Sequence, residues 1–235
     1  MSFNFDLLLF DADGTLLDFK KAEKMALKDL FFILSHSFSE EVLYMYESIN
    51  NKLWSDFEKG KINKSFLVEE RFRQLFEKFN IKNDPQLANK IYLNALTQYP
   101  FLIENAKEIC SLFVNKIPMI IVTNGIASIQ KTRIINAEIN SYFEKIYVSE
   151  EIGFQKPQIE YFNFVFKDLF KLNIHPPKER CLLIGDSITS DIIGGKNYNI
   201  KTCLYNPQNH KNETSVKADF EISNLKQLTN IIMRS

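Results

Sequence analysis

The chain has 235 residues, and its 29 lysine and arginine residues balance 29 aspartate and glutamate residues. A chain of this length can bury a sizeable core without disulfides or metals as staples. The balanced charge, with no block of like charges, argues against a nucleic-acid polymer or a membrane surface as partner, so a small molecule or a protein is expected.

Three cysteines, Cys110, Cys181 and Cys203, lie far apart in apolar contexts. This usage predicts reduced core thiols in a cytoplasmic protein, and argues against a disulfide framework or a cysteine metal cluster. The few residues before the first apolar run lack the basic and apolar regions of a signal peptide. No apolar run reaches the length of about eighteen residues that a membrane span needs.

A short apolar run, Leu7–Phe10, has no helical period and precedes a glycine-containing turn. Such a run predicts a buried parallel strand. Asp11 and Asp13 follow directly, and side chains two residues apart leave an extended backbone on the same side. Both acids are therefore expected at the carboxyl end of the strand, where open α/β sheets bind ligands. The alternative is that they are solvated turn formers, because Asp-Gly is common in turns.

From about residue 19 to residue 96 the apolar spacing is helical. Ser37 and Glu40 have the spacing of a capping box. Gly60 can end a helix, and Asp84-Pro85 can begin another. Helices with broad apolar faces must pack on one another, which predicts a compact bundle of about four helices. Three apolar stripes carry this prediction: Leu27, Leu30, Phe31 and Leu34; Val42, Met45, Ile49, Leu53 and Phe57; and Val68, Phe72, Leu75, Phe76 and Phe79.

After Tyr99-Pro100 the pattern changes to alternating helices and short apolar strands. Alternating β and α units predict an α/β fold, with a parallel sheet that helices cover on both faces. The first strand then belongs to a sheet whose other strands come about a hundred residues later, so residues 17–96 are predicted to be an insertion. Strands are expected at 119–122, 145–148, 181–184, 202–204 and 220–222, and helices at 104–115, 126–137, 158–170, 189–197 and from 225.

Polar groups follow several of these strands. Thr123-Asn124-Gly125 ends the second strand and precedes a helix, a setting in which backbone N–H groups can cradle a phosphate. Lys156 can balance acids that face a phosphate, since like charges about 4 Å apart cost on the order of 4 kcal/mol at an effective dielectric of about 20. The alternatives are an ordinary turn for Thr-Asn-Gly and a solvated surface position for Lys156.

Two further acids, Asp186 and Asp191, follow the strand expected at 181–184. Hard oxygen ligands without histidine or cysteine favour Mg²⁺ over Zn²⁺. We expect Asp186 to bind the metal, and Asp191 to bind it directly or to support the residues that do. The alternative is a helix N-terminus with favourable aspartates.

Four motifs in this order resemble those of the haloacid dehalogenase superfamily, most of whose members are magnesium-dependent phosphohydrolases. The motifs are Asp11-Ala12-Asp13-Gly14-Thr15, Thr123-Asn124-Gly125, Gly153-Phe154-Gln155-Lys156-Pro157 and Gly185-Asp186-Ser187 with Asp191. The resemblance covers nearly the whole chain. It implies a Rossmann-like catalytic core, residues 1–16 and 97–235, and an inserted four-helix cap domain, residues 17–96, able to act as a lid.

The resemblance also implies the roles of the motif residues. Asp11 is the expected nucleophile and Asp13 the general acid and base. Mg²⁺ is expected on Asp11, the backbone carbonyl of Asp13 and Asp186. Thr123 and Lys156 are expected to bind the phosphate and compensate its charge, with the Asn124 and Gly125 backbone assisting.

The stretches around Phe10–Phe19 and Val148–Pro157 are similar to the branch that contains bacterial pyrimidine 5′-nucleotidases. The implied activity is hydrolysis of nucleoside 5′-monophosphates. Phe19, Trp54 and Arg71 are candidates for contacts with the base; the alternatives are cap packing for the two aromatics and a surface helix position for Arg71. A phosphatase for phosphoglycolate or a sugar phosphate, and a catalytically silent scaffold, are the alternative functions.

Overall fold

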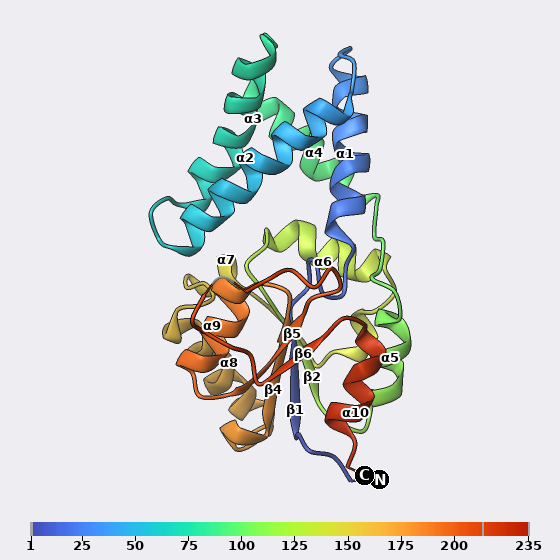
Figure 1. The fold of residues 1–235 in the computed structure, drawn as a ribbon, viewed down its shortest axis with the longest axis vertical. Helices are drawn as coiled ribbons and strands as arrows, with labels where there is room; N and C mark the ends of the chain where they lie inside the picture. The colour runs from blue at the N-terminus through green and yellow to red at the C-terminus, as the bar shows by residue number, and fades with distance from the viewer. Residues whose placement is uncertain (1, 213, 235) are drawn as a thin grey trace. The chain divides into compact units, whose positions relative to one another are not determined.

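In residues 2–212 and 214–234, which the computed structural model describes, six strands form one parallel sheet in the order β3-β2-β1-β4-β5-β6. The predicted α/β fold is confirmed. The first strand lies in the middle of the sheet, although the strands beside it come from far along the chain (Figure 1). The strands are β1 (Leu7–Phe10), β2 (Met119–Thr123), β3 (Lys145–Val148), β4 (Cys181–Gly185), β5 (Lys201–Tyr205) and β6 (Phe220–Ile222).

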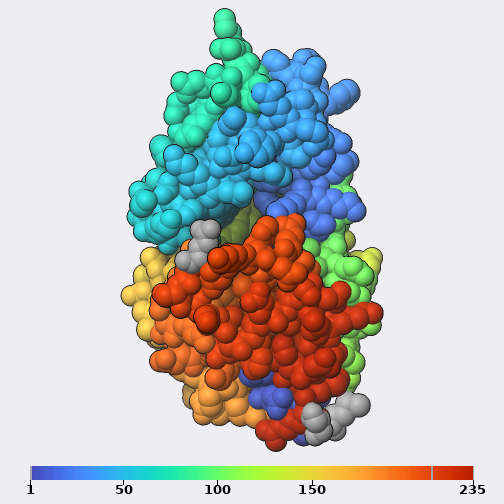
Figure 2. Space-filling view, in the orientation of Figure 1, coloured from blue at the N-terminus to red at the C-terminus, as the bar shows by residue number. Residues whose placement is uncertain are grey.

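Both faces of the sheet are covered, which explains why β1 is apolar at every position. Leu8 and Phe10 belong to the apolar cluster on one face, with residues of α5 and α10. Leu7 and Leu9 belong to the cluster on the other face, with residues of α8. Figure 1 shows these helices on opposite sides of the sheet. In the space-filling view, the orange and red C-terminal part of the chain forms most of the visible face of the part that contains the sheet (Figure 2).

Helices come between consecutive strands along the chain from β2 to β5, as parallel strand connections require. A π-helical turn, Ile188–Ile192, comes directly after β4 and runs into α9. The Ser187 side chain caps this turn by accepting a hydrogen bond from the Ser190 N–H (3.2 Å). The α-helices of this part are α5 (Ala106–Phe113), α6 (Ala127–Asn136), α7 (Ser149–Ile152), α8 (Ile159–Lys171), α9 (Ile193–Asn197) and α10 (Leu228–Ile232).

The chain divides into two compact units. Unit 1 contains the sheet and consists of the chain up to Phe19 and from Phe101 onward; unit 2 is Lys20–Pro100. The assignment of residues 17–96 to a cap and of the remainder to a catalytic core stays a prediction. The helices of the inserted segment are α1 (Phe19–Ile33), α2 (Glu40–Glu58), α3 (Lys64–Phe79) and α4 (Pro85–Thr97).

Unit 2 is held together by aromatic packing between its helices. The Tyr46 ring of α2 lies 5.4 Å from Phe72 and 5.5 Å from Tyr92, measured between ring centroids. As predicted, α4 begins at Pro85, with the Asp84 side chain as its cap. The predicted capping box at Ser37 and Glu40 is wrong: Ser39 caps α2, since its hydroxyl accepts from the Val42 N–H (3.2 Å). The three cysteines are free and buried, as predicted. Throughout the described ranges, no helix has both the length and the apolar character that crossing a bilayer demands.

Candidate active site

The parallel register brings the polar ends of three strands to one edge of the sheet. Phe10 of β1 pairs with Ile121 of β2 and with Ile184 of β4. The residues that follow these three positions therefore lie side by side at the carboxyl edge of the sheet. Asp11 is held there by its N–H, which donates to the Ile184 carbonyl (2.8 Å). The carboxyl edge of a parallel sheet is the usual place for a ligand site, because the strand ends and helix N-termini converge there.

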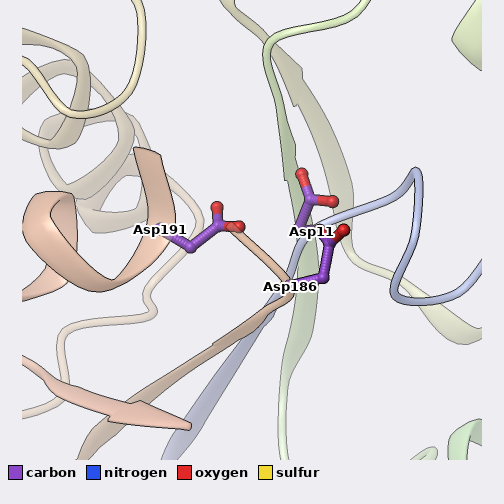
Figure 3. Close-up of side chains that lie close together, drawn as sticks. All are labelled: Asp11, Asp186 and Asp191. Carbon is purple, nitrogen blue, oxygen red and sulfur yellow. The ribbon is translucent and has the colours of Figure 1, made fainter. Parts of the chain in front are cut away.

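Three carboxylates meet at this edge. Asp11, Asp186 and Asp191 each place a carboxylate oxygen within 4.8 Å of the others. Asp191 reaches toward the other two from the helical turn after β4 (Figure 3). Asp11 and Asp191 are buried, whereas Asp186 is exposed. A set of hard oxygen donors with one exposed member fits a divalent cation such as Mg²⁺, which keeps part of its water shell.

Lys156 contacts two of these acids and is almost completely buried, with 1% of its surface exposed. Its ammonium group donates to Asp11 Oδ1 (2.7 Å), Asp191 Oδ1 (2.6 Å) and the Val122 carbonyl (2.8 Å). These contacts use all three ammonium hydrogens. Burial opposes the charge of this lysine, but the two carboxylates outweigh burial and raise its pKa. The surface alternative for Lys156 is wrong, because the side chain is buried and its ammonium contacts two carboxylates of the cluster.

The acidic cluster also shifts the pKa values of its own members. Burial raises the pKa of Asp11 well above its usual range, and the Lys156 charge opposes this rise. For Asp186, desolvation by the surrounding protein and the nearby Asp191 carboxylate raise the pKa to about 7. Both directions are those of carboxylates crowded together, for which a bound cation is the natural compensation.

Two glycines permit this crowding. A Cβ atom on Gly14 would lie 2.2 Å from Asp186 Oδ2, and one on Gly185 would lie 2.2 Å from Asp191 Oδ2. Gly14 also has a φ of +83°, a left-handed conformation that favours glycine. The glycines of the first and fourth motifs therefore leave room for the carboxylates to approach the backbone.

The second motif divides its polar groups between two tasks. The Thr123 hydroxyl accepts a hydrogen bond from the Gly125 N–H (3.1 Å). The Asn124 side chain instead pairs with the backbone of Lys156, donating to its carbonyl and accepting from its N–H, both at 2.9 Å. Asn124 thus positions the lysine segment through a contact that sequence reasoning did not anticipate.

Asp13 is not one of the three clustered carboxylates, and its side chain contacts α6. Gln130 Nε2 donates to Asp13 Oδ2 (2.6 Å), and the Arg133 guanidinium pairs with Asp13 Oδ1. Sequence reasoning missed both partners. A signal was present, since Gln130 and Arg133 share one helix face with buried Ile134, where apolar residues are the rule.

A family model described as haloacid dehalogenase-like hydrolase matches residues 8–205, which include all of these site residues. The chain belongs to this family of hydrolases. The resemblance expected from the four motifs is therefore confirmed.

Relatives of this hydrolase include named enzymes. It is 36% identical to the HAD-hydrolase YfnB of Bacillus subtilis, over 96% of this chain and 94% of YfnB. It is 33% identical to pyrimidine 5′-nucleotidase PynA of Streptococcus pneumoniae, over 95% and 93%. Pyrimidine 5′-nucleotidase YjjG of Escherichia coli is 27% identical, over 97% and 98%. A crystal structure of YfnB bound to magnesium superposes with a TM-score of 0.91, at 35% identity over 97% and 98% of the two chains.

The three residues proposed for base contacts lie in different surroundings in this hydrolase. Phe19 belongs to unit 1 and is half-buried, with the Arg133 guanidinium 5.7 Å from its ring centroid. Trp54 packs edge-on against Phe57 in unit 2. Their role in specificity stays a prediction.

Arg71 is the one of the three whose alternative was a surface position, and that alternative is wrong. It is 2% exposed and donates to the side-chain oxygens of Asn89 (2.7 Å) and Asn50 (3.4 Å). Its guanidinium lies 4.7 Å from the Tyr92 ring centroid. Asn50 in turn donates to Glu23 Oε1 (3.0 Å), so Arg71 is part of a buried polar network in unit 2.

Proposed function

We propose that this hydrolase is a magnesium-dependent phosphomonoesterase that acts through an aspartyl-phosphate on pyrimidine nucleoside 5′-monophosphates. The observation that carries the proposal is the buried Lys156 ammonium between Asp11 and Asp191, with Asp186 beside them. This arrangement supplies a buried carboxylate, a fixed positive charge and free oxygen ligands at one point. Attack on a phosphate dianion needs all three, because negative charge gathers there.

The metal would be held by Asp11, the backbone carbonyl of Asp13 and Asp186. Asp191 supports this set, since its Oδ1 accepts from Lys156 and its Oδ2 from the Ser187 N–H (3.1 Å). When bound, Mg²⁺ supplies charge that neutralises phosphoryl oxygens and orients the phosphate.

The chemistry falls to the two acids of the first motif. An oxygen of Asp11 attacks phosphorus and forms a P–O bond, while the ester P–O bond breaks and its electron pair leaves on the alcohol oxygen. Asp13 gives that oxygen a proton. A water molecule then attacks the phosphorus of the aspartyl-phosphate and loses a proton to Asp13. The bond to Asp11 breaks, inorganic phosphate departs, and both acids are regenerated.

Asp13 favours phosphate esters over haloacids as substrates. An alkoxide is a poor leaving group and needs a proton, whereas a halide leaves without one. In this proposal the Thr123 hydroxyl binds a phosphoryl oxygen, with the Asn124 backbone N–H assisting. The Gly125 N–H, which donates to Thr123 Oγ1, holds that hydroxyl in place. Lys156, whose three hydrogens contact Asp11, Asp191 and Val122, compensates the charge of the phosphate.

The nucleotide substrate rests on the relatives. Two enzymes named pyrimidine 5′-nucleotidases align with this chain over almost its full length. The buried free cysteines support action in a reducing compartment, which we propose is the cytoplasm.

The test is phosphate release from pyrimidine and purine nucleoside monophosphates, phosphoglycolate and hexose phosphates, with Mg²⁺ or EDTA. Wild type is compared with Asp11→Asn and with Asp168→Asn, a matched change at an α8 aspartate that pairs with Lys145 and Tyr147 instead. We expect preferential turnover of pyrimidine nucleotides that requires Mg²⁺, is lost in Asp11→Asn and persists in Asp168→Asn. Turnover of other phosphates alone would retain the mechanism and replace the substrate. Absence of all turnover would favour the silent scaffold.

A further inference from the structure

The Asp13 carboxylate is held by two side chains that the four motifs do not contain. Arg133 pairs with its Oδ1, and Gln130 Nε2 donates to its Oδ2 (2.6 Å). Both donors come from α6, one turn apart, and each is 1% exposed. Two donors on two oxygens fix the rotation of a carboxylate, which a single contact leaves free.

Gln130 also ties Asp13 to the second motif. The same Nε2 lies 3.1 Å from Thr123 Oγ1, so its two hydrogens serve an oxygen of each motif. The amide oxygen of Gln130 faces Arg133 Nη1 at 3.4 Å, which fixes the orientation of the amide. Thr123 Oγ1 accepts from Gln130 and from Gly125 N–H, so its own hydrogen remains available to a phosphoryl oxygen.

Arg133 is poorly explained as a packing residue. In the part of the chain that the structure describes, its Nε and Nη2 atoms are buried without a hydrogen-bond partner. Leaving buried polar atoms unpaired costs stability, so an apolar side chain would satisfy a purely structural need at lower cost. The Phe19 ring, 5.7 Å from the guanidinium carbon, covers the group without satisfying those atoms. What Arg133 does accomplish is the contact with Asp13.

We propose that Gln130 and Arg133 are positioning residues, which aim Asp13 at the oxygen of the leaving alcohol. The inference rests on the proposed phosphatase function and adds two residues of α6 to it. Arg133 anchors Oδ1, and Oδ2 exchanges the proton with the alcohol oxygen. The Gln130 contact survives this exchange, because a carboxyl O–H oxygen keeps a lone pair that an amide N–H can approach.

The proposal predicts an effect that depends on the leaving group. The constant kcat/KM reports the steps up to release of the alcohol, and it therefore isolates proton donation by Asp13. An alkoxide needs that proton, whereas p-nitrophenolate leaves without it. A wrongly oriented Asp13 should therefore lower kcat/KM for an alkyl phosphate and leave kcat/KM for p-nitrophenyl phosphate nearly unchanged.

The experiment measures kcat/KM with Mg²⁺ for p-nitrophenyl phosphate and for the alkyl phosphate that wild type hydrolyses fastest. The variants are Gln130→Met, Arg133→Met and Arg133→Lys. We expect each methionine variant to lose about 100-fold on the alkyl ester, as misplacement of a reacting group by about 1 Å does, and less than about threefold on p-nitrophenyl phosphate. Arg133→Lys should recover at least about tenfold of the loss, because Arg133 contacts Asp13 through one nitrogen and an ammonium is also a charged donor.

The matched control is Arg180→Met. Arg180 pairs with Asp6 at the opposite end of β1. Its loss should therefore change kcat/KM by the same factor for both substrates. Thermal unfolding and Mg²⁺ titration of each variant report its folding and its metal site.

The outcomes separate the inference from the function. Equal losses on the two esters, or no loss in either methionine variant, would overturn the positioning role while the phosphatase function stands. If wild type hydrolysed neither ester, the proposed function and the inference would fall together.

Discussion

Removal of the Lys156 charge should destabilise the protein more than any exposed lysine can. Its ammonium lies 2.7 Å from Asp11 Oδ1 and 2.6 Å from Asp191 Oδ1. Charges about 3 Å apart interact by roughly 5 kcal/mol at an effective dielectric of about 20, and desolvation of the lysine offsets much of this gain. Loss of one partner from a buried pair typically leaves a net cost of about 3 to 5 kcal/mol. For Lys156→Met this corresponds to a fall in Tm of roughly 6 to 20 °C.

The destabilisation should also grow with pH. Burial raises the pKa of Asp11 in the folded protein, and Lys156 is the charge that opposes this rise. Without the lysine this pKa rises further, so the folded variant holds a proton on Asp11 up to a higher pH than folded wild type does. A group whose folded pKa is raised loses stability as the pH climbs toward that pKa. The deficit of Lys156→Met should therefore be smaller at about pH 5 than at about pH 8.

The assay is thermal unfolding of both proteins in EDTA across this pH range. Lys145→Met is the matched control, because it removes another lysine–aspartate pair of unit 1 whose lysine is 44% exposed. Exposed pairs contribute about 1 kcal/mol or less, so the control should unfold near wild type. If Lys156→Met matched wild type at about pH 8, the assignment of Lys156 as the essential counter-charge would be refuted.

Three further predictions concern glycine, metal and surface charge. Gly14→Ala would bring a Cβ atom within 2.2 Å of Asp186 Oδ2, so Mg²⁺ affinity measured by calorimetry should fall about 10- to 100-fold; unchanged affinity would contradict the proposed metal ligand. The pKa of Asp186 is about 7, so Mg²⁺ must displace a proton below that pH, and its measured affinity should rise between about pH 6 and pH 8; a flat profile would argue against Asp186. Although burial opposes ionisation of Asp219, hydrogen bonds from Lys196 and Thr202 lower its pKa to about 2. Asp219→Asn should therefore cost about 1 to 2 kcal/mol in urea unfolding at about pH 7, and the deficit should shrink as the pH falls from about 4 toward 2; a deficit independent of pH would reject the ion pair.

Much of the fold follows from local patterns in the sequence. Strand β1 is apolar at every position because both faces of the sheet are covered. A short apolar run of this kind can be recognised in the sequence without knowing which strands pair with it. Asp84-Pro85 begins α4 as expected, since an aspartate cap and a proline in the first turn act within a few residues. The polar groups at the ends of β1, β2 and β4 were also visible, because they lie at or directly after the end of a strand, whereas α7 separates Lys156 from β3.

The start of α2 shows the limit of local reasoning. Ser37 and Ser39 both precede α2 and can both cap a helix. The capping-box spacing of Ser37 and Glu40 favoured Ser37 as the cap. In the structure Ser39 caps the helix with the Val42 N–H. Spacing alone does not decide between neighbouring caps, because the entry of the chain depends on where Phe38 packs, which is against Phe31 of α1.

Only the tertiary structure decided which polar groups meet. Lys156 contacts Asp11 across 145 positions of sequence, and Arg133 contacts Asp13 across 120. Arg71 is likewise buried because α2 and α4 bring Asn50, Asn89 and Tyr92 against it, and the sequence of α3 alone does not reveal this. Apolar periodicity is a local signal, because one element presents it alone. A buried charge is stable only beside partners that other elements bring, so its place is fixed by the assembled fold.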